Sequence, residues 1–141
     1  MATKIFVNLP VNDLPKSIEF FTKLGYTFNP QATDETATCM IISEDIYAML
    51  LTHAKFKSFT PKEICDTTKY TEMGISLSCE SRAQVDELVA KAVAAGGSTN
   101  SEPTDYGFMY QHDYQDLDGH NWGLIWMNCP SAGLYWRARR W

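Results

Sequence analysis

The sequence contains no apolar run that approaches the roughly 20 residues that a membrane-spanning helix needs. Its first four residues lead directly into a strand-like segment, without the apolar stretch and cleavage site of a signal peptide. We therefore expect a cytoplasmic protein with no membrane partner. The 141 residues fit one domain, or two half-size units that share a core.

Closely spaced cysteines are also missing. The four cysteines, Cys39, Cys65, Cys79 and Cys129, include no C-x-x-C pair, which argues against a local zinc knuckle or a thioredoxin-type motif. In a reducing compartment we interpret them as small buried hydrophobic residues and not as disulfide partners.

The signatures of several enzyme classes are absent. The chain has no G-x-S-x-G motif, no P-loop and no Rossmann fingerprint. Residues 116–119 resemble the start of a calcium loop, but the later carboxylates and the terminal glutamate are lacking, so we interpret them as a β-turn. The three histidines show no H-x-x-x-H or facial-triad spacing.

Positive charge is scarce outside the C-terminus. The net charge is −5, and without Arg137, Arg139 and Arg140, which all lie in the last five residues, the remainder carries −8. A body that acidic is a poor binder of nucleic acid. We interpret residues 130–141, which combine these arginines with Trp136 and Trp141, as a disordered or non-native tail rather than a stacking surface.

The first half of the chain shows the pattern of a strand, a helix and three more strands. Residues 4–11 alternate between two faces, one of which carries Ile5, Val7, Leu9 and Val11. Asp13 is a good helix N-cap, and Gly25 suits the position after the helix end. The expected helix has an apolar stripe of Leu14, Ile18, Phe21 and Leu24. Residues 26–31, 36–43 and 46–53 are strand candidates.

The second half repeats this order. Residues 73–79 alternate as a strand, a capping box at residues 81–84 starts a helix, and Gly96 and Gly97 end it. Residues 108–112 and 121–127 are strand-like, and a weaker strand is expected near residues 98–101. A second capping-box pattern at residues 60–63 predicts one helical turn in the connection. A repeat of roughly 70 residues is longer than solenoid periods and suggests duplication of a βαβββ module.

Two segments carry a family resemblance. VNLPVNDLPKSIEFFTKLGYTF and DYGFMYQHDYQDLDGHNWGLIWM resemble the opening and the closing hairpin of the vicinal-oxygen-chelate (glyoxalase/bleomycin resistance/extradiol dioxygenase) superfamily, which includes many predicted lactoylglutathione lyases. The resemblance covers about residues 4–129. It implies an α+β fold in which two βαβββ modules form a cupped, mostly antiparallel sheet with helices outside. The modules would span residues 1–57 and 72–129, joined by residues 58–71.

The resemblance implies the fold without the metal site that the family is known for. In metal-dependent members the first and the last strand of each module supply one ligand each, which makes four ligands. The resemblance places these positions at Phe6, Leu50, Gly74 and Gly123. Their side chains offer no lone pair to a divalent cation, and a shift to Met49 or Leu51 would serve no better. Glyoxalase and dioxygenase chemistry both depend on that metal. We therefore expect no metal and no other cofactor.

Strand alternation extends these four positions to a candidate ligand pocket. The period of two places further residues on the same faces: Asn8, Ala48, Thr52, Ser76, Asn121 and Ile125. Such a lining suits a neutral or aromatic small molecule, although the aromatic residues could equally fill the cup as core. His120 is a weak candidate for a general base, because histidine titrates nearest neutral pH; we favour its interpretation as a turn cap packed beside Trp122.

These observations leave three hypotheses about function. The first is a metal-free protein that binds a small molecule, forms a homodimer and could sequester a toxic compound or antibiotic. The second is a glyoxalase-type lyase or isomerase that recruits unusual ligands such as His120. The third is a structural or interaction module whose cup is filled by its own side chains.

Overall fold

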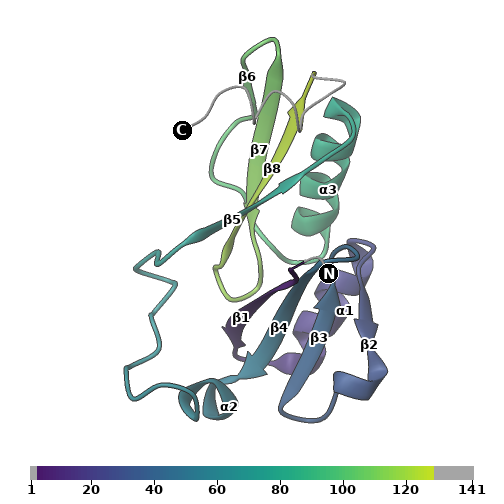
Figure 1. The fold of residues 1–141 in the computed structure, drawn as a ribbon. Helices are drawn as coiled ribbons and strands as arrows, with labels where there is room; N and C mark the ends of the chain where they lie inside the picture. The colour runs from purple at the N-terminus through teal and green to yellow at the C-terminus, as the bar shows by residue number, and fades with distance from the viewer. Residues whose placement is uncertain (1–2, 129–141) are drawn as a thin grey trace.

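Each half of the chain folds as a strand, a helix and three further strands (Figure 1). The structure is a computed structural model that describes residues 3–128, so the predictions about Cys129 and the tail lie outside the described residues. The first module consists of β1 (Ile5–Val11), α1 (Leu14–Lys23), β2 (Thr27–Asn29), the 3-10 turn η1 (Pro30–Ala32), β3 (Ala37–Ile41) and β4 (Ile46–Thr52), followed by α2 (His53–Lys57). The second consists of β5 (Gly74–Ser78), α3 (Arg82–Ala94), β6 (Thr104–Asp105), β7 (Met109–Gln115) and β8 (Asn121–Met127).

The strands form two four-stranded sheets with the orders β1-β4-β3-β2 and β5-β8-β7-β6. The first and last strands of each module pair in parallel, and the other neighbours are antiparallel. The predicted α+β fold with two βαβββ modules is therefore confirmed. β1 and β5 are end strands of their sheets. None of the helices within residues 3–128 has the length and apolar character that crossing a bilayer requires.

Both long helices begin and end where the sequence predicts. The Asp13 Oδ1 accepts a hydrogen bond from the Lys16 amide at 3.1 Å, and Gly25 follows α1 with a φ of 105°. The Ser81 Oγ accepts one from the Gln84 amide at 3.0 Å. The Gln84 Oε1 accepts in return from the Glu80 amide at 2.7 Å. These side chains satisfy backbone donors that a helix start leaves unpaired.

One hydrophobic core joins the two modules. Phe21 of α1 packs edge-on against Trp122 of β8, with ring centroids 5.4 Å apart, and Phe20 lies against Tyr114 of β7 at 6.3 Å. All four side chains are buried. Neither module could cover its apolar sheet face alone, so the contact between modules supplies much of the hydrophobic stabilisation.

The connection between the modules departs from the prediction. The helical turn expected at residues 60–63 is absent, and a short helix, α2, follows β4 instead, capped by Thr52. The Thr60 Oγ1 accepts a hydrogen bond from Lys62, only two residues ahead, and Glu63 forms an ion pair with Lys57. Both groups of the predicted capping box are therefore used elsewhere, which leaves the helical turn without its cap.

Two strand predictions also need correction. The strand expected at residues 26–31 ends at Asn29, because Pro30 begins the 3-10 turn. Residues 98–101 contribute only an isolated bridge from Ser98 to Gln115, and the edge strand forms at β6 instead.

Candidate functional site

The face of each sheet that lies away from the shared core is the candidate ligand surface. In the first module, parallel pairing aligns Phe6 with Tyr47 and Asn8 with Met49. The Phe6 and Tyr47 rings stack, with centroids 4.9 Å apart and planes 13° from parallel. Half of the Phe6 side chain remains exposed (50%). This face therefore offers an aromatic platform beside a side-chain amide.

Leu50 does not share this face, contrary to the prediction. It pairs with Leu9, and both side chains are buried in the core. Ala48, which pairs with Val7, lies on the core side for the same reason, and Thr52 pairs with Val11 and caps α2. The prediction was out of register by one residue, and because strand periodicity is two, such a shift moves every side chain to the opposite face. Met49 occupies the position assigned to Leu50.

In the second module the predicted residues do share one face. Parallel pairing aligns Gly74 with Asn121, Ser76 with Gly123 and Ser78 with Ile125. Four of the predicted residues border a hollow of about 350 Å³ together with residues of β7 and of the 101–104 segment: Ser76, Asn121, Gly123 and Ile125. A Cβ on Gly123 would lie 2.9 Å from the Ser76 Oγ, so the glycine keeps this hollow open. We call this space the β-face hollow.

A second, smaller pocket lies where the two modules meet. Its volume is about 110 Å³, and its lining brings together the predicted residues Asn8, Asn121 and His120. Phe56 of α2 and Met73 also line this pocket. Sequence reasoning missed Phe56 because it did not predict α2.

The closing turn of the second module is tied to the first module through His120 and Asp118. The His120 Nε2 lies 2.7 Å from the Pro10 carbonyl oxygen. The Asp118 Oδ1 accepts a hydrogen bond from the Asn12 amide at 2.8 Å, and the Asp118 carbonyl oxygen accepts one from the Thr67 hydroxyl. The turn therefore joins β8 to β1 and to the connection.

Asp116 holds this turn in shape from inside the protein. Its Oδ1 accepts hydrogen bonds from the Asp118 and His120 amides, and its Oδ2 accepts from the Trp122 Nε1 at 3.0 Å. Burial raises the pKa of the Asp116 carboxyl above its ordinary value; the charge of His120 and the three donated hydrogen bonds oppose this shift. The turn interpretation of residues 116–119 is thus supported, and Gly119 provides its positive φ of 84°.

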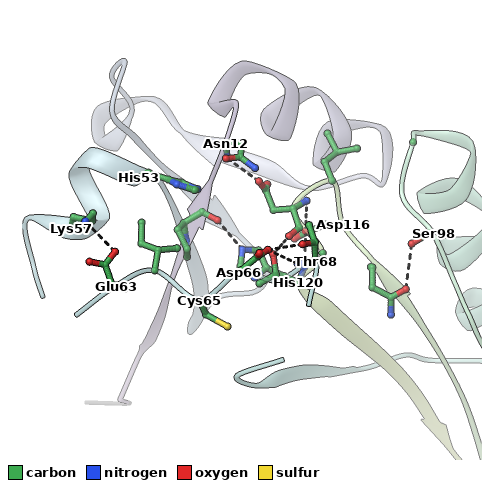
Figure 2. A pocket seen from close by; sticks show the side chains of 18 residues that line it. Asn12, His53, Lys57, Glu63, Cys65, Asp66, Thr68, Ser98, Asp116 and His120 are labelled. Carbon is green, nitrogen blue, oxygen red and sulfur yellow. Dashed lines mark hydrogen bonds and ion pairs between the residues drawn. The ribbon is translucent and has the colours of Figure 1, made fainter. Parts of the chain in front are cut away.

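A wider cleft lies beside this turn. Its volume is about 720 Å³. Figure 2 shows His53 and Lys57 of α2 on one side of it and Asp116 and His120 on the other. The Lys57 ammonium pairs with Glu63 across 3.6 Å.

His120 has one ring nitrogen left for proton transfer. A carbonyl oxygen can only accept, so the contact with Pro10 places the ring proton on Nε2. Only Nδ1 then carries a lone pair in the neutral ring. His120 lies in the closing turn as predicted, and its ring contacts Pro10 of the first module, a contact that the prediction of packing beside Trp122 did not include.

The residues that the resemblance assigns to metal positions, with Met49 in place of Leu50, have side chains that do not fit a divalent cation. Phe6 and the two glycines, Gly74 and Gly123, provide no side-chain donor, and the Met49 thioether is a soft ligand unsuited to the oxygen- and nitrogen-rich sites of this chemistry. Throughout residues 3–128, no group of three or more His, Cys, Asp or Glu side chains is arranged to hold a metal ion.

Comparison with known proteins establishes the family. The sequence model of the Glyoxalase/Bleomycin resistance protein/Dioxygenase superfamily matches residues 5–124, and the chain belongs to this superfamily. The hypothetical protein SA1046 from S. aureus is 31% identical, with a TM-score of 0.74 over 89% of this chain and 94% of that one. No curated protein matches the sequence.

Two further solved structures share the fold. A glyoxalase/bleomycin resistance protein/dioxygenase family enzyme from Burkholderia phytofirmans PsJN is 15% identical, with a TM-score of 0.76 over 89% of this chain and 99% of that one. The genomically encoded fosfomycin resistance protein FosX from Listeria monocytogenes is 17% identical, with a TM-score of 0.63 over 89% and 93%. At these identities the likeness concerns the fold alone.

Proposed function

We propose that this chain is a small-molecule-binding member of its superfamily that works without a metal at the family's ligand positions. The observation that carries the proposal is the β-face hollow, which Gly123 keeps open and which is bordered by hydrogen-bonding groups such as Ser76 and Asn121. Concave sites with a few placed polar groups are the usual form of small-ligand pockets. The aromatic platform of Phe6 and Tyr47 would supply apolar contact.

We further propose that two copies complete the site. β1 and β5 are end strands, and neither pairs with a second strand within residues 3–128. Exposed apolar side chains accompany these edges, including Ile5 and Phe6 on β1 and Met73 just before β5. Open edges of this kind favour pairing with another chain. Pairing of β1 with β5 of a second copy would place the aromatic platform and the β-face hollow on one continuous sheet.

A cytoplasmic location belongs to the same proposal. Among residues 3–128, Cys39, Cys65 and Cys79 are all free thiols, which suits a reducing compartment.

A screen of ligands by thermal shift tests the proposal. Bound ligand raises apparent stability by mass action, by about 2.7 kcal/mol at a concentration 100 times Kd. We compare Ser76→Ala with the double variant Ser76→Ala, Gly123→Val, in which the valine fills the hollow without meeting the Ser76 Oγ. Ligands should stabilise the single variant, although less than the wild type because the Ser76 hydroxyl is lost, and should fail to stabilise the double variant.

Two results would contradict the proposal. One is the absence of any stabilising compound across a broad library, which would favour a purely structural module. The other is stoichiometric Ni, Zn or Fe in the purified protein that disappears in His120→Ala, as elemental analysis would show. That outcome would favour the glyoxalase-type lyase.

A further inference from the structure

Among residues 3–128, two carboxylates and one histidine are the titratable side chains that border the β-face hollow. Asp113 of β7 and Glu102 border it, whereas no lysine or arginine among residues 3–128 does. The other polar side chains around it are neutral, among them Ser76, Gln111 and Asn121. A ligand held here therefore meets two carboxylates among neutral hydrogen-bonding groups, with no lysine or arginine from the described part of the chain beside them.

The carboxylate of Asp113 is accessible from the hollow. Asp113 pairs directly with Gly123 across the strands, so its nearest cross-strand neighbour has no side chain to cover it. The Asp113 Oδ1 accepts a hydrogen bond from the Ser101 Oγ at 2.9 Å. The Oδ2 accepts none from residues 3–128, which leaves one carboxylate oxygen for a ligand.

The bordering histidine forms no ion pair with this carboxylate. The His112 Nε2 lies 2.7 Å from the Ser101 carbonyl oxygen and 3.2 Å from the Thr99 Oγ1. The imidazole thus attaches the 99–101 segment to β7, and its Nε2 proton is used there. The same segment supplies the Ser101 hydroxyl that orients Asp113.

We propose that the β-face hollow selects ligands with a cationic, donor-rich polar group, such as an amidinium, guanidinium or primary ammonium, and rejects anions. This inference rests on the proposed function and adds the ligand class. Charge-assisted hydrogen bonds to a carboxylate are stronger than neutral ones, and the net charge of −5 attracts cations to the chain as a whole. An anionic group would face the carboxylates of Asp113 and Glu102, and among the described lining residues only neutral donors such as the Asn121 amide would oppose that repulsion.

Three probes of the same size and shape test this inference: benzamidine, benzamide and benzoate, which are cationic, neutral and anionic at pH 7. Each is titrated into the full-length protein while backbone amide NMR signals of Ser76, Asp113 and Gly123 are followed. We expect benzamidine to bind at least about tenfold more tightly than benzoate, with benzamide between them. Added salt should weaken benzamidine binding, because the charges are near the surface.

Matched variants assign the effect to one carboxylate. Asp113→Asn retains an oxygen that accepts from Ser101 but removes the charge, and should weaken benzamidine binding about three- to tenfold while leaving benzamide unchanged. Glu35→Gln makes the same change of charge in the other module, before β3, and should have no effect. Three results would overturn the inference. Benzoate could bind as tightly as benzamidine, Asp113→Asn could leave the affinity for benzamidine unaltered, or benzamidine could cause no shift of the amide signals of Ser76, Asp113 and Gly123. Binding of the neutral or anionic probe at the hollow as tightly as benzamidine, or more tightly, would overturn the ligand class but leave the proposed function intact. That function fails on the two results named for it above: no compound binds, or the purified protein holds a stoichiometric metal that is lost in His120→Ala.

Discussion

The imidazole of His120 reaches across the chain to Pro10: its Nε2 lies 2.7 Å from a carbonyl oxygen 110 residues earlier in the sequence. The contact joins the beginning of β8 to the end of β1. Together with the bond from the Asn12 amide to Asp118, it fastens the closing turn of one module to the other. His120, which histidine chemistry made a weak candidate for a general base, therefore helps to hold the two modules together.

Removal of this imidazole should weaken the molecule. We expect His120→Ala to lower the free energy of unfolding by about 1–2 kcal/mol, since the half-buried contact with the Pro10 carbonyl is lost. Urea denaturation measures the change. His53→Ala, at an exposed position at the start of α2, is the control and should stay within about 0.5 kcal/mol of the wild type. Equal effects of the two substitutions would contradict a joining role for His120.

Asp116 should make stability depend on pH in an unusual direction. Because burial raises its pKa above the ordinary value of 3.8, the folded state binds the proton more tightly than the unfolded state does. This contribution is fully present below pH 3.8 and is lost as the pH rises through the higher folded-state pKa.

The variant Asp116→Asn isolates this effect, since all other groups titrate in both proteins. The amide nitrogen would face the Trp122 Nε1 donor or the two backbone donors, so we expect a loss of about 1–3 kcal/mol. The stability difference between wild type and variant should shrink as the pH is raised from 4 toward 7. A difference that grows over this range would show that the donated hydrogen bonds outweigh burial.

The aromatic contact between the modules should be the most sensitive part of the core. Phe21→Ala would remove the ring that packs on Trp122, and the resulting cavity should cost about 3–5 kcal/mol. Chemical denaturation followed by tryptophan fluorescence measures this loss. Phe59→Ala, at a side chain that is 67% exposed, should change stability by no more than about 0.5 kcal/mol.

Removal of the Tyr114 hydroxyl, unlike removal of the Phe21 ring, should not destabilise the protein. The hydroxyl is buried and has no hydrogen-bond partner among the described residues, and burial raises its pKa above the usual range. Because an unsatisfied buried hydroxyl costs about 1–3 kcal/mol, Tyr114→Phe should leave stability unchanged or increase it. A loss of more than 1 kcal/mol on thermal denaturation would indicate that the hydroxyl has a partner, such as an internal water.

The proposed dimer predicts an effect at the edge of β1. Ile5→Lys places a charge at an end strand and should shift the protein from dimer to monomer, because charged side chains block edge-to-edge pairing. Light scattering coupled to size-exclusion chromatography measures the change in mass. Val93→Lys on α3 exposes a similar charge at a comparably open position (45% exposed) and should leave the mass unchanged. A monomeric wild type would refute the dimer directly.

Local signals predicted the helices well. Asp13, Gly25 and Ser81 act through backbone groups within a few residues of their own positions, so their effect does not depend on the rest of the fold. The capping pattern at residues 60–63 failed for the same kind of local reason, since Thr60 and Glu63 each found a different nearby partner. The strand periodicity likewise predicted which residues of β5 and β8 share a face.

Strand alternation separates the two faces of a strand but does not say which residue of one strand lies beside which residue of another. The sequence itself determined the alternation within β1 and β4 and the order of the elements, because both depend on local periodicity. It also determined that Phe6, Gly74 and Gly123 are unsuited as metal ligands, because this depends on side-chain chemistry alone. Only the tertiary structure decided three other relationships. These are the register that aligns Leu9 with Leu50, the approach of His120 to Pro10 and the position of Asp113 opposite Gly123. These relationships depend on how two strands or modules pack against each other. That packing depends on contacts between residues distant in the sequence throughout the core, which no local pattern specifies.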